Sequence, residues 1–346
     1  MKRNLMLIVI GLLVASLLAG CMGTIVVVER PAEETLPALE EGALKTGLAV
    51  ITSVGKSVSA STESDGAAEY DVTLAAVLVD DEGVIHACRL DSIGATVNFD
   101  ATGAIATDLT AAVQTKNELG ENYGMVAWGG AIAEWDAQAA ALCDFAVGKT
   151  VEELKSGAVD ETGYAPDGSD LRTSATIYLA GYVSAIEAAA ANARHLGAES
   201  GDVLNLVTIN GLDSSANAEA EKEGTAQLDV NVAAVSTKDG VITSCTLDAV
   251  QAKVTFDAAG NITADLTAPV QTKNELGENY GMVAWGGAIA EWNEQAASFA
   301  SYVTGKTADE VADIAVEEGK PTEEDLTASV TIKIGGFQEL IAKALG

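Results

Sequence analysis

The pattern of apolar and polar positions predicts a β-hairpin at two places in the chain. In each place a stretch rich in valine, leucine and alanine leads into a tight turn and then returns as a second such stretch. Gly83 and Gly240 occupy the turn position at which glycine is favoured. A further short strand and a second turn follow, so a meander of antiparallel strands is expected in each place. The expected strands are residues 68–79, 84–93 and 95–99, and residues 226–236, 241–250 and 252–256.

Helical spacing replaces the alternation after each meander. From Ala131, apolar residues recur at steps of three and four until Gly148, and the same stripe precedes Gly305. A short acidic helix, an alternating run typical of a strand, and a closing amphipathic helix complete each copy. These segments are residues 150–158, 174–181 and 182–193, and residues 307–315, 329–336 and 337–345. The predicted fold class is α+β, with two tandem copies of an antiparallel β-sheet domain packed with helices.

An internal repeat explains why the pattern occurs twice. The segment Val113–Trp135 is repeated letter for letter as Val270–Trp292, and all 4 tryptophans of the chain lie in these two segments. Copies of this length are tandem globular domains rather than solenoid repeats. We therefore expect one domain over residues 47–200 and a second over residues 201–346.

The N-terminal residues are typical of a targeting segment. Two basic residues, an apolar stretch and the sequence Leu18-Ala19-Gly20-Cys21 predict a lipoprotein signal peptide over residues 1–21. Such a site would receive a diacyl lipid on Cys21 and hold the protein on the extracytoplasmic face of the cell membrane. An ordinary secretory peptide is the alternative. The acidic, proline-containing residues 22–46 are expected to form a flexible tether.

Charge and cysteine content exclude several classes of function. The chain has 51 acidic against 19 basic Lys and Arg residues, a formal net charge of -32, and no basic patch. Nucleic acid is therefore not an expected partner. Apart from Cys21 there are three cysteines, none in a CxxC pair, and 2 histidines. No metal site and no catalytic nucleophile with a histidine base is predicted.

An aromatic, glycine-rich loop is the first candidate for ligand binding. The segment GENYGMVAWGG lies between the sheet and the helix of each copy. Planar side chains there are suited to stacking on a flat conjugated ring, and glycines allow a close approach. The residues expected to form this site are Tyr123 and Trp128, with Tyr280 and Trp285 in the second copy. Trp135 and Trp292 are expected to be core residues of the following helix.

A second candidate lies near the end of each copy, in DLRTSAT at residues 170–176 and DLTASVT at residues 325–331. These stretches resemble the attachment motif of the FMN-binding domain family, which runs Asp, two variable residues, Ser or Thr, Gly, Ala, Thr. In the first copy the residues that match are Asp170, Thr173, Ala175 and Thr176, and in the second they are Asp325 and Thr331. The segments TKNELGENYGM and EW…Q, together with the tandem lipoprotein layout, resemble lipoproteins of Gram-positive extracellular electron transfer.

The resemblance implies a cofactor and a function. A flavin transferase would join the phosphate of FMN to Thr176 and Thr331, and the protein would carry electrons from a membrane donor to extracellular acceptors. It would be an electron carrier more than a turnover enzyme. We expect the phosphate beside the closing helix, with Lys116 and Lys273 facing it.

Departures from the motif leave other interpretations open. Ser174 and Ser329 stand where the family has glycine, and Ala328 and Val330 also differ from it. The alternating run around Thr176 is equally typical of an ordinary strand. The alternative function is a non-enzymatic surface lipoprotein whose repeated domains bind a cell-envelope ligand or a partner protein without flavin.

Overall fold

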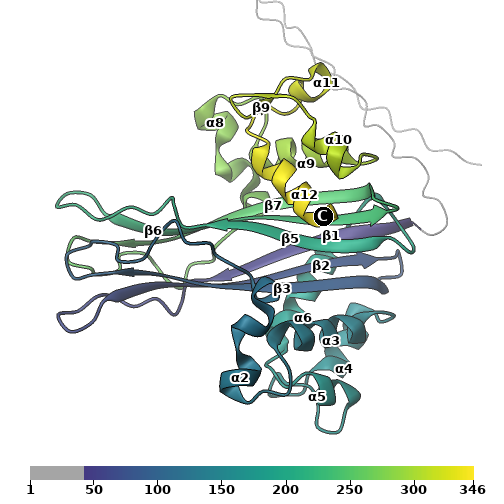
Figure 1. The fold of residues 1–346 in the computed structure, drawn as a ribbon, viewed down its shortest axis with the longest axis horizontal. Helices are drawn as coiled ribbons and strands as arrows, with labels where there is room; N and C mark the ends of the chain where they lie inside the picture. Colours follow the sequence, from purple (N-terminus) through teal and green to yellow (C-terminus); the bar gives the residue numbers. More distant parts are fainter. Residues whose placement is uncertain (1–42) are drawn as a thin grey trace, which may run out of the picture. The chain divides into compact units, whose positions relative to one another are not determined.

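An antiparallel sheet forms the centre of each copy in the computed structural model, which describes residues 43–346 (Figure 1). The first sheet has the strand order β3-β2-β1-β4 and the second has the order β5-β6-β7. The α+β fold class is confirmed. The strands of the first sheet are β1 (Ala43–Ser53), β2 (Gly66–Val79), β3 (Ile85–Phe99) and β4 (Arg194–Glu199). Those of the second are β5 (Val203–Gly211), β6 (Gly224–Lys238) and β7 (Val241–Phe256).

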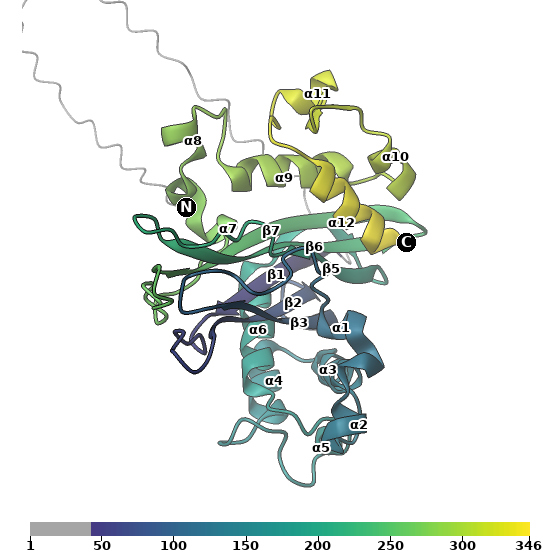
Figure 2. The ribbon, with the colours of Figure 1, turned by 60° about the vertical axis from the view of Figure 1, so that its left-hand side comes forward.

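The helices of each copy lie on one side of its own sheet, as Figures 1 and 2 show. In the first copy they are α1 (Lys116–Leu119), η1 (Gly120–Tyr123), α2 (Met125–Gly129), α3 (Trp135–Ala146), α4 (Val151–Ala158), α5 (Asp170–Ser174) and α6 (Ala180–Asn192). In the second copy they are α7 (Lys273–Leu276), η2 (Gly277–Tyr280), α8 (Met282–Gly286), α9 (Trp292–Val303), α10 (Ala308–Ala312), α11 (Glu324–Thr327) and α12 (Gly335–Leu345). The short strands β8 (Val316–Glu317) and β9 (Lys320–Pro321) pair between α10 and α11.

Burial on both faces of the central strands explains their nearly continuous apolar sequence. In β2, Leu74 and Ala76 point into a core shared with the other sheet, whereas Ala75 and Val77 pack against the helices of their own copy. A strand in which apolar and polar residues alternate has only one buried face. A strand whose residues are nearly all apolar is therefore buried on both faces. The two sheets therefore pack face to face, with a helical layer outside each of them.

The shared core makes the two copies parts of one compact unit over the described residues 43–346. At its centre the rings of Phe99 and Phe256 stack with centroids 4.1 Å apart and planes 5° apart. Around them the copies exchange equivalent backbone hydrogen bonds: the N–H of Ala60 donates to Gly260 and the N–H of Ala218 donates to Gly103, both over 2.8 Å. This reciprocity shows that the repeats pack with approximate twofold symmetry.

Several strands differ from the sequence-based expectation. β1 and β5 were not predicted, and β1 includes residues 43–46, which the sequence placed in the tether. Leu44 and Thr46 are buried there because β1 pairs with both β2 and β4. The two expected strands over residues 84–99 are one strand, β3, since its pairing with β2 continues through Gly94. Gly83 and Gly240 have φ values of 83° and 79°, as the predicted turns require.

The helical segments also correct two expectations. The helix expected from Ala131 begins at Trp135, after the extended residue Glu134. The alternating runs over residues 174–181 and 329–336 are not strands. They are short connections into α6 and α12, in which Ala175 and Val330 are buried. In each run a glutamine side chain, Gln138 or Gln295, accepts two backbone N–H groups that a strand would donate to its neighbour.

The predicted signal peptide, Cys21 and residues 22–42 of the tether lie outside the described residues. Within residues 43–346, no helix combines the length and the apolar character needed to cross a membrane.

Candidate functional site

Thr176 lies on a turn between α5 and α6 that is held by a buried glutamine of α3. The Oε1 atom of Gln138 accepts hydrogen bonds from the N–H of Thr176 over 2.8 Å and from the N–H of Ile177 over 3.2 Å. The same oxygen accepts the Thr176 hydroxyl over 3.3 Å, and the Gln138 amide donates to the carbonyl of Ala133 over 2.8 Å. Gln138 is fully buried, so it fixes the position of this turn relative to α3.

The second copy repeats this arrangement although its motif differs. Gln295 accepts hydrogen bonds from the N–H groups of Thr331 and Ile332 over 2.8 and 3.2 Å, and from the Thr331 hydroxyl over 3.2 Å. Val330, which replaces alanine, is buried, and Ser329 donates its hydroxyl to the carbonyl of Leu326. The substitutions in the second motif therefore leave the threonine turn intact.

Some of the backbone donors at the start of the helix that follows each turn are already used. The N–H groups of Leu179 and Ala180 donate to the carbonyl of Gly163, and the N–H of Ile334 donates to the carbonyl of Gly319. α6 starts four residues after Thr176 and α12 starts four residues after Thr331, and neither has a side-chain cap among the described residues. A Cβ atom added at Gly181 or Gly335 would meet no other atom within 4 Å. The first N–H groups of a helix lack intrahelical partners and carry the positive end of its dipole. Each threonine is thus close in sequence to a helix end suited to an anion.

Arg172 and two aromatic rings, which the sequence did not single out, form a cluster on segments before and after Thr176 in the first copy. In the second copy Thr327 and Lys333 stand in the places of Arg172 and Tyr178. Tyr178 is 53 % exposed and packs edge to face against Tyr164 with centroids 5.6 Å apart. The guanidinium of Arg172 lies 5.7 Å from the Tyr164 ring, and its Nη1 atom is buried with no hydrogen-bond partner among the described residues. The Nε atom of the same side chain lies 3.7 Å from a carboxylate oxygen of Asp167, so Nη1 is the donor that remains to bind an anion.

The remaining motif residues have local roles. Asp170 is an exposed residue in the first turn of α5, and Thr173 donates its hydroxyl to the carbonyl of Asp170 over 2.7 Å. Asp325 is exposed in the first turn of α11. These side chains do not contact Thr176 or Thr331 in the hydrogen bonds of the described chain.

A second cluster forms around each core tryptophan. Trp135 is 2 % exposed, as expected, and its indole N–H donates to the hydroxyl of Tyr182 on α6 over 2.9 Å. The Lys116 ammonium lies 5.3 Å from the centroid of the Trp135 ring and 5.0 Å from that of Tyr123. Lys116 was expected to face a phosphate, but here it lies over two aromatic rings.

The second copy has an equivalent cluster. Lys273 lies 4.9 Å from the ring centroids of both Tyr280 and Trp292. Phe337 takes the place of Tyr182, so the indole of Trp292 packs against a ring without a hydroxyl, at 5.8 Å between centroids.

The loop tryptophans are separate from both clusters. Trp128 is 93 % exposed and Trp285 is 86 % exposed, so neither is a wall of an enclosed ring site. Val126 and Ile132, which flank Trp128 in the sequence, are also exposed, as are Val283 and Ile289 in the second copy. The helix that carries each tryptophan is held by the carboxylate of the EW…Q segment. Glu134 accepts the N–H groups of Met125 and Val126 over 2.8 and 2.9 Å, and Glu291 does the same for Met282 and Val283.

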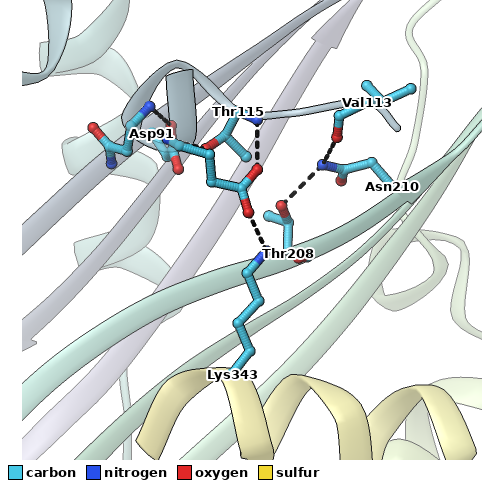
Figure 3. Close-up of polar contacts among 8 residues, drawn as sticks. Asp91, Val113, Thr115, Thr208, Asn210 and Lys343 are labelled. Atoms are coloured by element: carbon cyan, nitrogen blue, oxygen red, sulfur yellow. Dashed lines mark hydrogen bonds and ion pairs between the residues drawn. The ribbon is translucent and has the colours of Figure 1, made fainter. Parts of the chain in front are cut away.

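Contacts from the second copy hold the segment that leads into the first cluster (Figure 3). Thr115 and Glu118 form a capping box at the start of α1. Lys343 on α12 forms an ion pair with Glu118 and donates to the carbonyl of Thr208 over 2.7 Å. Asn210 donates to the carbonyl of Val113 over 3.1 Å. The loop before Tyr123 is therefore positioned by both copies.

Buried aspartates support this segment in both copies. Asp91 accepts the N–H of Asn117, and Asp248 accepts the N–H of Asn274 over 3.1 Å and the N–H of Ala249 over 2.7 Å. Burial raises the pKa of Asp91, and it raises the pKa of Asp248 to about 6, although these hydrogen bonds oppose the shift. A carboxylate held in this way is costly to ionise, because it is removed from water.

We expect Asp248→Asn to remove part of the pH dependence of stability. The folded protein binds the Asp248 proton more tightly than the unfolded chain, so this contribution is complete below about pH 4 and is lost as pH rises through about 6, a change of about 2–3 kcal/mol. Asparagine keeps the acceptor oxygen and cannot ionise. Urea unfolding between pH 5 and pH 7 should show a smaller loss of stability in the variant. Asp265→Asn, at an exposed turn, should keep the wild-type slope; an unchanged slope in Asp248→Asn would contradict the assignment.

No metal centre accompanies these clusters: within residues 43–346 there is no group of three or more His, Cys, Asp or Glu side chains able to hold an ion. Comparison of the chain with protein-family models, with curated proteins and with solved structures found no match.

Proposed function

We propose that this protein is a membrane-anchored, extracytoplasmic flavoprotein that carries electrons through FMN esterified to Thr176 and Thr331. The observation that carries the proposal is the repeated threonine turn. In both copies a buried glutamine holds the threonine, and a helix with no side-chain cap and with an open glycine follows four residues later. This geometry is retained although the two motifs share only Asp, Leu, Ser and Thr.

The residues around Thr176 fit a phosphoester. Esterification removes the hydroxyl proton and so loses only the 3.3 Å hydrogen bond to Gln138, while the two backbone hydrogen bonds to Gln138 remain. The N-terminal end of α6 favours the negative charge of the phosphate. Arg172 adds a cation with a free donor, and Tyr178 offers an exposed ring for stacking.

The two copies differ in how well they fit. Thr327 stands at the position that corresponds to Arg172, so the second copy lacks this cation, and Lys333 stands in place of Tyr178. We therefore propose that the first copy is the more completely modified one.

The division of labour between cofactor and chain follows from this arrangement. FMN, when bound, supplies the ability to take up and release electrons. Gln138 fixes the attachment turn, the first turn of α6 stabilises the phosphate, and the exposed position of Tyr178 keeps the adjoining surface open to an electron partner. A covalent link retains the cofactor outside the cell, where a dissociated one would be diluted. The proposal also includes a lipid on Cys21, a tether over residues 22–42, a flavin transferase and a membrane electron donor.

Covalent flavin is tested by co-expressing the full-length chain with a flavin transferase. The expected product is yellow after denaturation and carries up to two FMN adducts in its intact mass. Thr176→Ala should remove the first adduct, Thr331→Ala the second, and the double variant should stay colourless. A wild-type chain that remains unmodified beside a flavinylated control protein would refute covalent attachment.

The alternative, a flavin-free lipoprotein that binds a cell-wall glycan, is favoured by one specific observation. Each copy exposes a tryptophan with an apolar neighbour on each side, and exposed apolar groups of this kind mark binding surfaces. Titration of the flavin-free chain with soluble peptidoglycan fragments should then shift tryptophan fluorescence. The shift should disappear in the Trp128→Ser, Trp285→Ser double variant; no shift in the wild-type chain would refute glycan binding.

A further inference from the structure

An unbroken apolar segment lies on the surface of each copy. Residues 124–133 and the identical residues 281–290 contain no charged, hydroxyl or amide side chain. Trp128 and Trp285 project from these two apolar segments and are the most exposed large apolar side chains within residues 43–346. Contiguous apolar groups on a surface mark a site of interaction, because leaving them in water is unfavourable. Each apolar segment therefore indicates a partner that accepts apolar groups.

The backbone of each apolar segment is fixed by hydrogen bonds within the chain. α2 lies between Gly124 and Gly130, whose φ values of 79° and 63° favour glycine. The N–H of Trp128 donates to Gly124 over 3.0 Å, the N–H of Ala131 donates to Met125 over 3.1 Å, and the first two N–H groups of α2 donate to the glutamate described above. α8 repeats these contacts. Backbone donors that are already paired can enter a poorly hydrated medium, in which unpaired ones would be costly.

The composition of the apolar segments and the charge of the chain indicate the chemistry of the partner. Val126 and Ile132 beside Trp128 offer only apolar contact, whereas a polar ligand such as a glycan is oriented by polar groups placed beside the ring. Tryptophan is enriched where an apolar medium meets water, because its ring is apolar and its N–H is polar. The net charge of -32 disfavours an anionic surface. A bilayer surface with uncharged headgroups fits these properties.

We infer that one apolar segment of each chain lies in the headgroup layer of the membrane to which the protein is anchored. This inference rests on the lipid anchor at Cys21 in the proposed function and not on the flavin. Residues 22–42 span at most about 70 Å when fully extended, so the apolar segments stay close to the bilayer. α2 and α8 belong to opposite helical layers, as Figures 1 and 2 show, so a flat membrane contacts one of them at a time. The contact orients the sheets and leaves the other segment facing away from the membrane.

The test uses the lipidated chain, purified from membranes and reconstituted into phosphatidylcholine vesicles with or without bromine near the headgroup end of the acyl chains. Bromine quenches a tryptophan only on close approach, so the buried Trp135 and Trp292 serve as an internal reference. We expect brominated lipid to lower the tryptophan emission of the wild-type chain and to leave that of the Trp128→Ser, Trp285→Ser double variant unchanged. Each single variant should keep part of the quenching, because the remaining segment can take the same position.

Cosedimentation with the vesicles reports separately on the lipid anchor, and the double variant should still sediment. Anionic phosphatidylglycerol in the vesicles should reduce the quenching of the wild-type chain, and salt should restore it, because the chain is strongly acidic. A wild-type chain that sediments but is quenched no more than the double variant would overturn the inference and leave the anchor standing. A tryptophan response to soluble peptidoglycan fragments in place of lipid would do the same. A wild-type chain that does not sediment would refute the anchor, and the inference with it.

Discussion

Phe99→Ala lowers the free energy of unfolding by about 3–5 kcal/mol, because it opens a cavity at the centre of the core that the two copies share. Phe99 is fully buried, and its ring is stacked on Phe256 at 4.1 Å between centroids. Truncation therefore removes both the buried apolar area and the aromatic contact. The effect should reach both copies, since the cavity lies between their sheets rather than within one of them.

The measurement is urea unfolding followed separately in each copy. Trp135 and Trp292 are buried in different copies, so each can report on its own copy through its fluorescence. With the exposed Trp128 and Trp285 replaced, a Trp292→Phe background reports on the first copy and a Trp135→Phe background reports on the second. Phe99→Ala should lower both midpoints. Phe256→Ala is the matched variant, and the double variant should cost less than the sum of the two, because the stack is lost only once. A midpoint that falls in the first copy alone would contradict the shared core.

Gln138→Ala lowers the free energy of unfolding by about 2–4 kcal/mol, an effect larger than its single amide suggests. The truncation leaves the N–H groups of Thr176 and Ile177 and the carbonyl of Ala133 without the partner that they have now. Buried donors and acceptors without partners cost more than the hydrogen bond itself contributes. The turn before α6 should also become mobile.

Gln295→Ala is the matched variant in the second copy and should have an effect of similar size, since Gln295 makes the same contacts. Hydrogen exchange distinguishes the loss of the hydrogen bonds to Gln138 from general destabilisation. The amides of Thr176 and Ile177 should exchange much faster in Gln138→Ala, while those of Thr331 and Ile332 change only as far as global stability does. Equal acceleration at both turns would show that Gln138 has no specific role at Thr176.

Local patterns in the sequence predicted much of the fold. The turn glycines Gly83 and Gly240, the strands around them, and the apolar stripe of α3 all depend on contacts between near neighbours, which a periodic sequence records. The burial of Trp135 and Trp292 also followed from this stripe. One exception was the run before α6, where the apolar residues alternate as in a strand but the N–H groups of Thr176 and Ile177 donate to Gln138 instead of to a neighbouring strand.

The candidate site was predictable only in part. Thr176 and Thr331 were identified from a motif, but the residue that holds Thr176 is 38 positions away in the chain. Gln138 belongs to the EW…Q segment noted in the sequence, but nothing in that segment indicates that it contacts Thr176. The burial of the Arg172 Nη1 atom without a hydrogen-bond partner likewise depends on packing between distant segments.

The sequence by itself determined the duplication, the α+β class and the position of most hairpins and helices, because each of these is encoded within a short stretch of chain. Only the tertiary structure decided that the two sheets share one core, that the loop tryptophans face outward, and that a buried glutamine holds each threonine. The physical reason is that these features depend on which apolar faces meet. Each sheet has two apolar faces. The order of residues along a strand does not indicate which face will be covered by helices and which by the other copy.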